Sequence, residues 1–273
     1  MSKQISILGC GWLGLPLAER LMSQGYTIKG STTSKNRLSI LENAGITPFL
    51  IQLKEHRIEG NLEAFLQDSD VLIIAFPPKL QKNPEANFVS KMTHFVNTLK
   101  QRAIPNVIYV SSTSVFQDKE ADDTGFRVIT EDITPDGTSR KARQLIEGET
   151  LLQDASEFKT TIIRFGGLLG KQRHPAKYLA GRTGLKNPEA PVNLIHLRDC
   201  LAIIEGILDT DSFGTVFHGV NPIHQSRKAY YQFTAEAMDL EKPEFDDNGI
   251  SLGKVIYSKR LNTDLGFEFQ EEI

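Results

Sequence analysis

The order of apolar runs along the chain constrains its fold more than any other feature of the sequence. Short runs of strand-forming residues, such as QISILG (4–9), DVLIIAF (70–76) and NVIYVSS (106–112), alternate with segments whose apolar residues recur at helical spacing. Strands that are apolar throughout are buried on both faces of a parallel sheet, and right-handed crossovers place helices on both of these faces. The sequence therefore predicts an α/β fold with a doubly wound parallel sheet of the Rossmann type.

The pattern loosens beyond Gly166, where residues 167–191 are rich in glycine and proline. Further strands are predicted at VNLIHL (192–197) and GTVFHGV (214–220), and a helix at SRKAYYQFTAEAMD (226–239). We expect residues 1–165 plus about 193–220 to form the Rossmann domain. Residues from about 166–192 plus 221–273 would form a small, partly interleaved C-terminal lobe of α+β type.

Charge and cysteine content exclude several classes of function. The 273 residues carry 31 basic and 34 acidic side chains with no long run of one sign, so neither nucleic acid nor a membrane surface is an expected partner. The first residues lack the apolar core of a signal peptide, and no segment approaches the ~20 apolar residues of a membrane span. Cys10 and Cys200 are the only cysteines, so we expect no disulfide, no metal site and a reducing, cytoplasmic location.

A glycine motif follows the first predicted strand directly and opens the first predicted helix. Gly9 permits a tight turn, Gly11 permits close approach of a pyrophosphate to the backbone, and Gly14 permits close packing of helix on strand. The N-terminus of the helix then offers N–H donors and a positive dipole to the phosphates. The sequence therefore predicts a dinucleotide site, whose turn comprises Gly9, Cys10, Gly11, Trp12, Leu13 and Gly14. The alternative is a glycine turn that only packs well.

The end of the second predicted strand bears on the choice of dinucleotide. NAD-specific sites usually place Asp or Glu there to accept a hydrogen bond from the ribose. Here the positions carry hydroxyls and cations instead, namely Thr32, Thr33, Ser34, Lys35 and Arg37. Charge-assisted bonds to a 2′-phosphate favour NADP, although NAD stays open. The alternative is a helix cap at Ser34 followed by two solvated cations.

Four consecutive hydroxyl residues, Ser111 to Ser114, close the predicted strand 106–112. Ligands of open α/β sheets bind at the carboxyl ends of the strands, so these hydroxyls are candidate site residues. The sequence AFPPK closes the preceding strand, and Ala75, Phe76 and Pro77 would form a wall of the same crevice.

With these motifs the chain resembles the short-chain dehydrogenase/reductase superfamily, in its extended or atypical branch of epimerase- and dehydratase-like proteins. The resemblance spans nearly the whole chain and is carried by GCGWLG, VIYVSSTSVF, ITEDITPDG, TTIIRFGGLLGKQR and VNLIHLRDC. It implies that Ser112 matches the catalytic Ser/Thr, which hydrogen-bonds the substrate oxygen at the carbon that exchanges hydride. It also implies that Thr113 assists Ser112.

The resemblance further implies a Tyr-x-x-x-Lys pair on the next helix, in which a lysine and the oxidised nicotinamide stabilise a phenolate whose ordinary pKa is about 10. The helix TSRKARQLIEGETLL contains no tyrosine. One alignment puts Lys141 and Leu145 at the two positions, and a shift of two residues puts Ser139 and Arg143 there. The chain departs from the family pattern here, as does a subset of atypical members that the chain resembles most.

Two other side chains are candidates for the missing proton donor, and three further polar residues are expected to have structural roles. His174 and Tyr178 lie in the segment that borders the substrate pocket in the extended branch, although RHPAKYL equally fits a solvated helix start. Arg164 is expected to pair with a buried carboxylate rather than with an anionic substrate. We expect Asp199 to cap a helix and His196 to bond a local backbone group.

Tyr230 and Tyr231 are expected in the core, on an amphipathic helix. Trp12 is expected to pack against the cofactor or against a neighbouring loop.

The resemblance implies an NAD(P)-binding oxidoreductase or epimerase/dehydratase-like enzyme that acts on a small substrate, sugar-like or nucleotide-linked. The departure at the tyrosine position motivates an alternative, a catalytically silent NADP-binding module that reports to a protein partner. A homo-oligomer is also open. A Rossmann dehydrogenase of another family is a third alternative, but the strand-rich region after Thr160 argues against its usual helical second domain.

Overall fold

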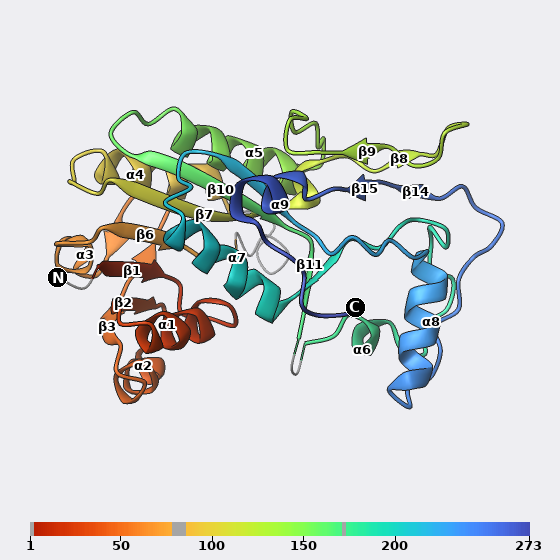
Figure 1. Ribbon diagram of the computed structural model, residues 1–273, viewed down its shortest axis with the longest axis horizontal. Coiled ribbons are helices and arrows are strands. Elements are labelled where there is room, and N and C mark those ends of the chain that lie inside the picture. The colour runs from red at the N-terminus through yellow and green to blue at the C-terminus, as the bar shows by residue number, and fades with distance from the viewer. Residues whose placement is uncertain (1–2, 78–85, 171–172) are drawn as a thin grey trace. The chain divides into compact units, whose positions relative to one another are not determined.

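The fold is built around one parallel sheet, as the computed structural model shows for residues 3–77, 86–170 and 173–273 (Figure 1). The sheet has seven strands in the order β13-β10-β7-β6-β1-β2-β3. In that order the strands are Val216–Gly219, Lys159–Phe165, Asn106–Ser112, Val71–Ile74, Gln4–Leu8, Thr27–Thr32 and Thr47–Leu50. The predicted doubly wound parallel sheet of Rossmann type is confirmed.

The central strands are buried as their composition requires. All four residues of β6 are buried, and in β1 the side chains of Ile5 and Ile7 are 0% exposed. The buried polar residue of β1, Ser6, satisfies its hydroxyl with the Phe65 carbonyl at 2.7 Å and with Ser69 Oγ at 2.6 Å. An unpaired buried hydroxyl is unfavourable, so these contacts explain how serine is tolerated in the middle of the sheet.

Helices connect the strands and expose their polar faces. They are α1 (Gly14–Ser23), α2 (Leu38–Asn43), α3 (Leu62–Leu66), α4 (Phe88–Leu99), α5 (Arg140–Gln153) and α7 (Leu197–Asp209). In α1, Leu17 and Leu21 are buried, and Arg20 forms an ion pair with the buried Glu205 of α7. None of the helices in the described ranges is long and apolar enough to cross a bilayer.

The chain divides into two compact units, each made of three segments. The first comprises residues 1–112, 139–163 and 204–216, and the second comprises residues 113–138, 164–203 and 217–273. The first unit also contains η1 (Lys35–Arg37), β4 (Gln52–Leu53) and β5 (Ile58–Glu59). The second contains η2 (Thr113–Val115), β8 (Lys119–Glu120), β9 (Val128–Ile129), β11 (Gly167–Leu169), α6 (Ala176–Leu179), β12 (Leu194–His196), α8 (Arg227–Ala237), β14 (Leu252–Gly253), β15 (Val255–Ile256) and α9 (Lys259–Leu265).

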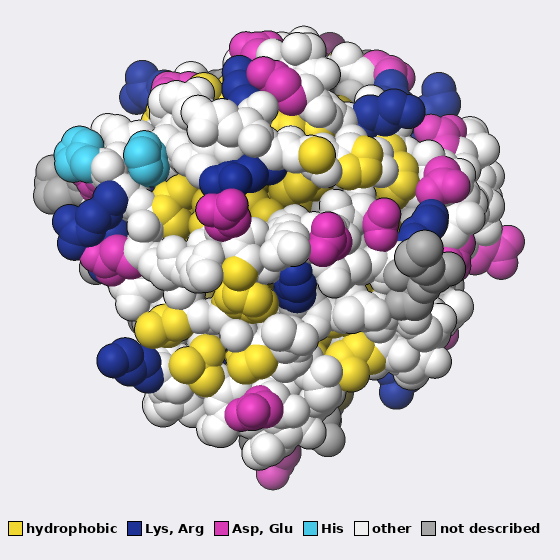
Figure 2. All heavy atoms as spheres, turned by 90° about the vertical axis from the view of Figure 1, so that its left-hand side faces the viewer, with side chains coloured by type: hydrophobic (Ala, Val, Ile, Leu, Met, Phe, Trp, Pro, Cys, Tyr) yellow, Lys and Arg dark blue, Asp and Glu magenta, His cyan; other side chains and the backbone are white. Residues whose placement is uncertain are grey.

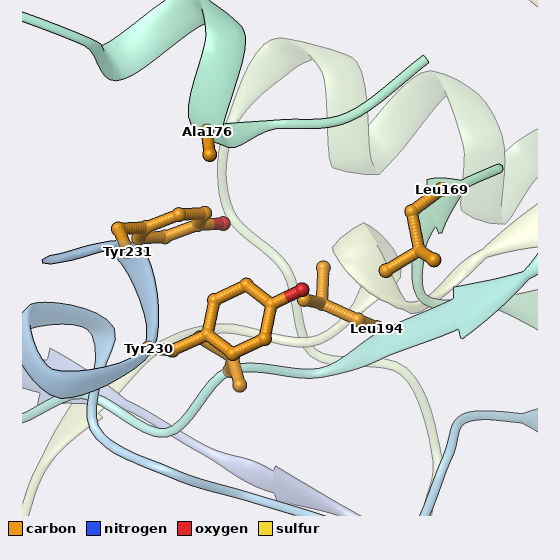
Figure 3. Packing of buried hydrophobic residues seen from close by; sticks show 6 residues of the cluster. Leu169, Ala176, Leu194, Tyr230 and Tyr231 are labelled. Atoms are coloured by element: carbon orange, nitrogen blue, oxygen red, sulfur yellow. The ribbon is translucent and has the colours of Figure 1, made fainter. Parts of the chain in front are cut away.

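The second unit has an apolar cluster of its own, to which Leu169, Ala176 and Leu194 contribute (Figure 3). Tyr230 and Tyr231 of α8 belong to it, with ring centroids 5.1 Å apart in an edge-to-face arrangement. Both side chains are buried, at 2% and 8% exposure. The expectation that these tyrosines are core residues is confirmed.

Asp199 corrects one expectation. Helix α7 already begins at Leu197, so Asp199 lies in its first turn and is not its cap. Its carboxylate Oδ1 accepts the Gln270 N–H at 3.0 Å, and burial raises the pKa of this carboxyl. His196 behaves as expected, since its Nδ1 accepts the Arg198 N–H at 3.3 Å. Asp199 therefore binds a backbone group that is distant in sequence and does not cap its own helix.

The molecular face drawn in Figure 2 shows basic and acidic side chains interspersed, with small apolar areas between them. No field of a single sign dominates that face.

Candidate functional site

The glycine turn between β1 and α1 is held by hydrogen bonds from its backbone to Ser31 of β2. Gly9 N–H donates to Ser31 Oγ at 2.9 Å, and Cys10 N–H donates to the Ser31 carbonyl at 2.8 Å. Gly9 has φ +109°, and a Cβ added to it would lie 3.2 Å from the Ala75 carbonyl carbon and oxygen. Gly9 is therefore required both by its backbone conformation and by the close approach of β6.

Gly14 and Gly11 differ in what a side chain would meet. A Cβ at Gly14 would lie 2.3 Å from the Gly9 carbonyl oxygen, so this glycine lets α1 begin against the turn. A Cβ at Gly11 would meet nothing within 4 Å. Packing within the protein therefore does not explain Gly11. Its open surface adjoins the N-terminus of α1, whose first N–H groups have no partners within the helix. The residues present thus fit a pyrophosphate.

Cys10 contributes to this site through its backbone alone. Its side chain is 2% exposed, and burial raises the pKa of the thiol to about 12. The Sγ atom fills the space above Gly30, where an added Cβ would lie 2.7 Å from it. Leu13 is also buried, whereas Trp12 is partly exposed. The thiol is therefore a packing group and is not a nucleophile.

The hydroxyl and basic residues after β2 lie beside the glycine turn. Arg37 Nη2 donates to the Cys10 carbonyl at 3.2 Å, which holds the guanidinium next to the turn. Thr32 Oγ1 accepts the Ser34 N–H at 3.2 Å, and Thr33, Ser34 and Lys35 are exposed. The Ser34 hydroxyl makes no capping hydrogen bond, so a helix cap does not account for this serine.

Ala75, Phe76 and Pro77 follow β6 on the side of the turn that faces Gly9. The Ala75 N–H donates to the Leu8 carbonyl at 3.0 Å, and a Cβ on Gly9 would lie 3.2 Å from Phe76 Cβ. Ala75 and Phe76 therefore lie close to the turn, and Pro77 is exposed. That they line a cofactor crevice stays a prediction. Pro78 and Lys79 of the same motif lie outside the described residues.

The hydroxyl cluster after β7 splits into two parts. Ser111 donates from Oγ to Glu149 Oε1 of α5 at 2.5 Å, and both residues are buried. Because neighbouring residues of a strand point to opposite faces, Ser112 points away from this contact. Thr113 is buried at the start of η2. Ser111 is thus a structural residue, whereas Ser112 and Thr113 remain the candidates for substrate contact.

Glu149 has a structural role that the sequence does not reveal. The carboxylate is 2% exposed on the face of α5 that covers β7, and the short hydrogen bond from Ser111 joins the two elements. The sequence indicates this role in one way: Glu149 is a charged residue at a position that lies on the apolar face of an amphipathic helix.

Helix α5, RKARQLIEGETLLQ, carries no tyrosine. Lys141 is exposed and Leu145 is 2% exposed, so these two positions offer no acid/base pair. Tyr109 of β7 lies close to the helix, since a Cβ on Gly148 would lie 3.7 Å from its hydroxyl oxygen. Burial raises the pKa of Tyr109 far above its ordinary value, with a further increase from the Glu149 charge, so this phenol stays protonated.

His174 and Tyr178 lie in the second unit. His174 Nδ1 accepts the Ala176 N–H at 3.2 Å, so the neutral ring carries its proton on Nε2, 3.3 Å from the Tyr230 hydroxyl. Burial lowers the pKa of His174, with a smaller effect of Lys177. Tyr178 is 71% exposed on α6. His174 thus has a structural role at the start of α6, and catalysis by either residue stays a prediction.

The loop after Ser112 is supported by a buried polar cluster of the second unit. Lys254 Nζ donates to the Phe116 carbonyl at 2.9 Å and to Asp118 Oδ1 at 2.7 Å. The Phe116 ring lies 5.2 Å from the guanidinium carbon of the buried Arg164 and packs edge-to-face on His218. The conformation of this loop therefore depends on Arg164, His218 and Lys254, all of which lie more than 40 residues beyond Phe116 in the sequence.

Similar proteins bind nicotinamide dinucleotides. A family model described as NADP oxidoreductase, coenzyme F420-dependent, matches residues 4–112. The structure of MoeE5 in complex with UDP-glucose and NAD has a TM-score of 0.79 at 16% identity, covering 100% of this chain and 95% of MoeE5. UDP-glucuronic acid 4-epimerase from Bacillus cereus, in complex with NAD, has a TM-score of 0.76 at 16% identity, covering 98% and 92%. These likenesses show the shared Rossmann-like fold.

A curated relative is similar over its whole length. Protein YeeZ of Escherichia coli K12 is 30% identical over 271 residues, which cover 98% of this chain and 96% of YeeZ. Because this likeness runs through nearly the whole of both sequences, the chain belongs to the family of Protein YeeZ.

Proposed function

We propose that the protein is an NADP(H)-dependent enzyme of the atypical extended short-chain dehydrogenase/reductase type, an oxidoreductase or an epimerase/dehydratase-like enzyme. The observation that carries this proposal is Gly11, whose missing side chain leaves open space at the N-terminus of α1. The match of residues 4–112 to an NADP-binding oxidoreductase family supports the cofactor class. The likeness to proteins solved with UDP-glucose or named for UDP-glucuronic acid supports a small, sugar-like or nucleotide-linked substrate.

NADP is proposed over NAD because of the groups beside the turn. Residues 31–37 contain no carboxylate to accept a ribose hydroxyl, and Arg37 is held against the Cys10 carbonyl. A 2′-phosphate would meet the hydroxyls of Thr32, Thr33 and Ser34 and the charges of Lys35 and Arg37. Charge-assisted hydrogen bonds are about twice as strong as neutral ones, so these two cations should dominate the discrimination.

Replacement of Lys35 and Arg37 by alanine is expected to weaken NADPH binding by roughly 10- to 100-fold and NADH binding by less than about threefold. The reason is that NADH lacks the phosphate that the two cations would bind. Titration of reduced-nicotinamide fluorescence measures both affinities. A matched control is Lys54→Ala, which removes an exposed cation elsewhere in the same unit. Equal losses for the two dinucleotides would contradict the choice of NADP.

The proposed reaction uses Ser112 to orient the substrate. The bound nicotinamide would supply or accept a hydride at its C4 atom. Ser112, with Thr113 beside it, would hydrogen-bond the carbonyl or hydroxyl oxygen on the carbon that exchanges that hydride. Since α5 carries no tyrosine, the proton on this oxygen would come from another group or from water. His174 and Tyr178 are the side chains proposed for this step.

Ser112→Ala is expected to leave NADPH affinity within about twofold of wild type while lowering turnover by roughly 100-fold. The hydroxyl would contact the substrate and not the dinucleotide. Oxidation of NADPH across a panel of carbonyl compounds measures turnover, and fluorescence titration measures affinity. Unchanged turnover in the variant would remove Ser112 from the mechanism.

The second candidate function is a catalytically silent module that binds NADP and signals to a protein partner. The absence of tyrosine from α5 favours it. Such a module would bind NADPH and alter the fluorescence of Trp12, yet oxidise none of it in the same panel. Turnover of any compound in the panel would exclude the silent module.

A further inference from the structure

A hollow opens between the N-terminal halves of α4 and α5, both of which belong to the first unit. It has a volume of about 450 Å³ and is lined by Asn87, Val89, Arg140, Arg143, Gln144 and Glu147. Each helix follows a strand of the parallel sheet along the chain, so both begin toward the carboxyl edge of the sheet. The hollow therefore lies at the edge where ligands of this fold class bind.

The charges at the start of α5 oppose the helix dipole. Arg140, Lys141 and Arg143 follow the cap residue Ser139 within about one turn, and the first turn contains no acid. Cations near a helix N-terminus are unfavourable, because the unpaired N–H groups there already carry partial positive charge. Stability of the helix therefore does not explain this triplet of cations. A bound anion would offset their repulsion.

Among the residues that the structure describes, the two guanidinium groups of the hollow have no carboxylate partner. Arg140 donates from Nη2 to the Ala86 carbonyl at 3.5 Å, a long contact. Within the described part of the chain, no acid lies within ion-pair distance of Arg140 or Arg143. Among the described lining residues Glu147 is the single acid, so two positive charges there face one negative charge. Elsewhere in the same unit Arg20 and Arg57 both have carboxylate partners.

The two amides of the lining are oriented as donors. Gln144 is 8% exposed, and its Oε1 accepts the Phe88 N–H at 2.6 Å. Asn87 caps α4, and its Oδ1 accepts the Ser90 N–H at 3.0 Å. Because each carbonyl oxygen is occupied by a backbone N–H, each side chain is left with its NH₂ group as hydrogen-bond donor. The lining thus offers two guanidiniums and two amide NH₂ groups, with one carboxylate acceptor.

We propose that this hollow binds the phosphate group of a small phosphorylated substrate. The planar guanidinium group of arginine can donate two parallel hydrogen bonds to two oxygens of a phosphate. The carboxylate of Glu147 would accept a hydrogen bond from a hydroxyl group of the same molecule. The identification of the ligand as substrate rests on the proposed function. The phosphate site itself does not depend on it.

The site is tested with inorganic phosphate and glycerol 3-phosphate as probes, by the rise in melting temperature at constant ionic strength without dinucleotide. Wild type is expected to respond to both compounds. Arg140→Gln with Arg143→Gln should raise the apparent dissociation constants at least about tenfold. Removal of these cations relieves repulsion at the helix start, so the variant should fold.

Two control variants test whether the response arises in this hollow. Lys141→Gln removes an equal charge from an exposed position in the same turn, outside the lining, and should respond as wild type does. The glycine turn is the other candidate for phosphate binding, and Gly11→Val disrupts it. If the response arises in the hollow, this variant should respond as wild type does. A loss in either control, or an unaffected double variant, would overturn the proposal. A response to inorganic phosphate alone would overturn the assignment to a phosphorylated substrate.

The same variants separate this proposal from the proposed function. NADPH affinity of the single variant Arg140→Gln is expected to match wild type, since Arg140 belongs neither to the glycine turn nor to the positions aligned with the Tyr-x-x-x-Lys pair. If no form of the protein bound NADPH while the phosphate response persisted, the proposed function would fail and the phosphate site would stand. If the protein bound NADPH but showed no response to the phosphate compounds, the phosphate site would be rejected and the proposed function would stand.

Discussion

Gly11→Val is expected to weaken NADPH binding by more than about 100-fold while the protein keeps its fold. The added side chain meets no protein atom within 4 Å of its Cβ, so the native packing is undisturbed. It would instead occupy the space beside the N-terminus of α1 that a pyrophosphate requires. Fluorescence titration measures the affinity, and thermal unfolding without dinucleotide measures stability.

Gly14→Val provides the matched comparison, because its Cβ would collide with the Gly9 carbonyl oxygen at 2.3 Å. This variant should lose stability as well as affinity, whereas Gly11→Val should lose affinity alone. Retained NADPH binding in Gly11→Val would mean that the turn is only structural, and the proposed cofactor would then be wrong.

Acidification is expected to destabilise the protein through His218. Its side chain is 0% exposed, and burial together with the nearby Arg164 lowers the pKa to about 3 from an ordinary value of 6.5. The unfolded state therefore binds a proton at a higher pH than the native state. Stability contributed by the neutral ring is present above pH 6.5 and is lost progressively as the pH falls toward 3. The expected loss is on the order of 4 kcal/mol across this window.

The surroundings of His218 explain why protonation is unfavourable. Its ring is buried and packs edge-to-face on Phe116. Its Nδ1 lies 3.1 Å from the Tyr257 carbonyl, and this hydrogen bond raises the pKa but only partly offsets the effect of burial. Burial and the charges of Arg164 and Arg260 oppose protonation, and together they outweigh the Tyr257 carbonyl and Asp132, which favour it. Glu131 is also near, since its Oε1 accepts the His218 N–H at 3.2 Å.

Denaturant unfolding at pH 7 and pH 4 measures this effect. His218→Gln should show a smaller stability difference between the two pH values than wild type, even if it is less stable at pH 7. His94, exposed on α4, supplies the control, and His94→Gln should reproduce the wild-type difference. An unchanged difference in His218→Gln would show that acid unfolding originates elsewhere.

The central sheet and the glycine turn were predictable because their determinants are local. A strand buried on both faces must be apolar throughout, and a turn that passes as close to Ala75 as Gly9 does must contain glycine. The core positions of Tyr230 and Tyr231 followed from helical spacing in the same way. Each of these features can be read within a window of about 15 residues.

The remaining features depend on residues that are distant in sequence. Asp199 resembles a helix cap until Gln270 is known to donate to it. Ser111 and Ser112 look alike in the sequence, and only the position of Glu149 separates the structural hydroxyl from the candidate one. The hollow between α4 and α5 likewise combines residues 87–89 with residues 140–147. Patterns along the chain carry no information about such pairings.

The threading of the chain through its two units has a consequence for how this protein can be divided. Each unit is assembled from three segments, and the chain passes from one to the other five times before it ends. No single truncation point releases either unit whole, because any N- or C-terminal fragment long enough to contain all of one unit also carries pieces of the other. A swap of the second unit between relatives therefore requires all three of its segments to be grafted together, and gene fusion at one junction would not achieve it.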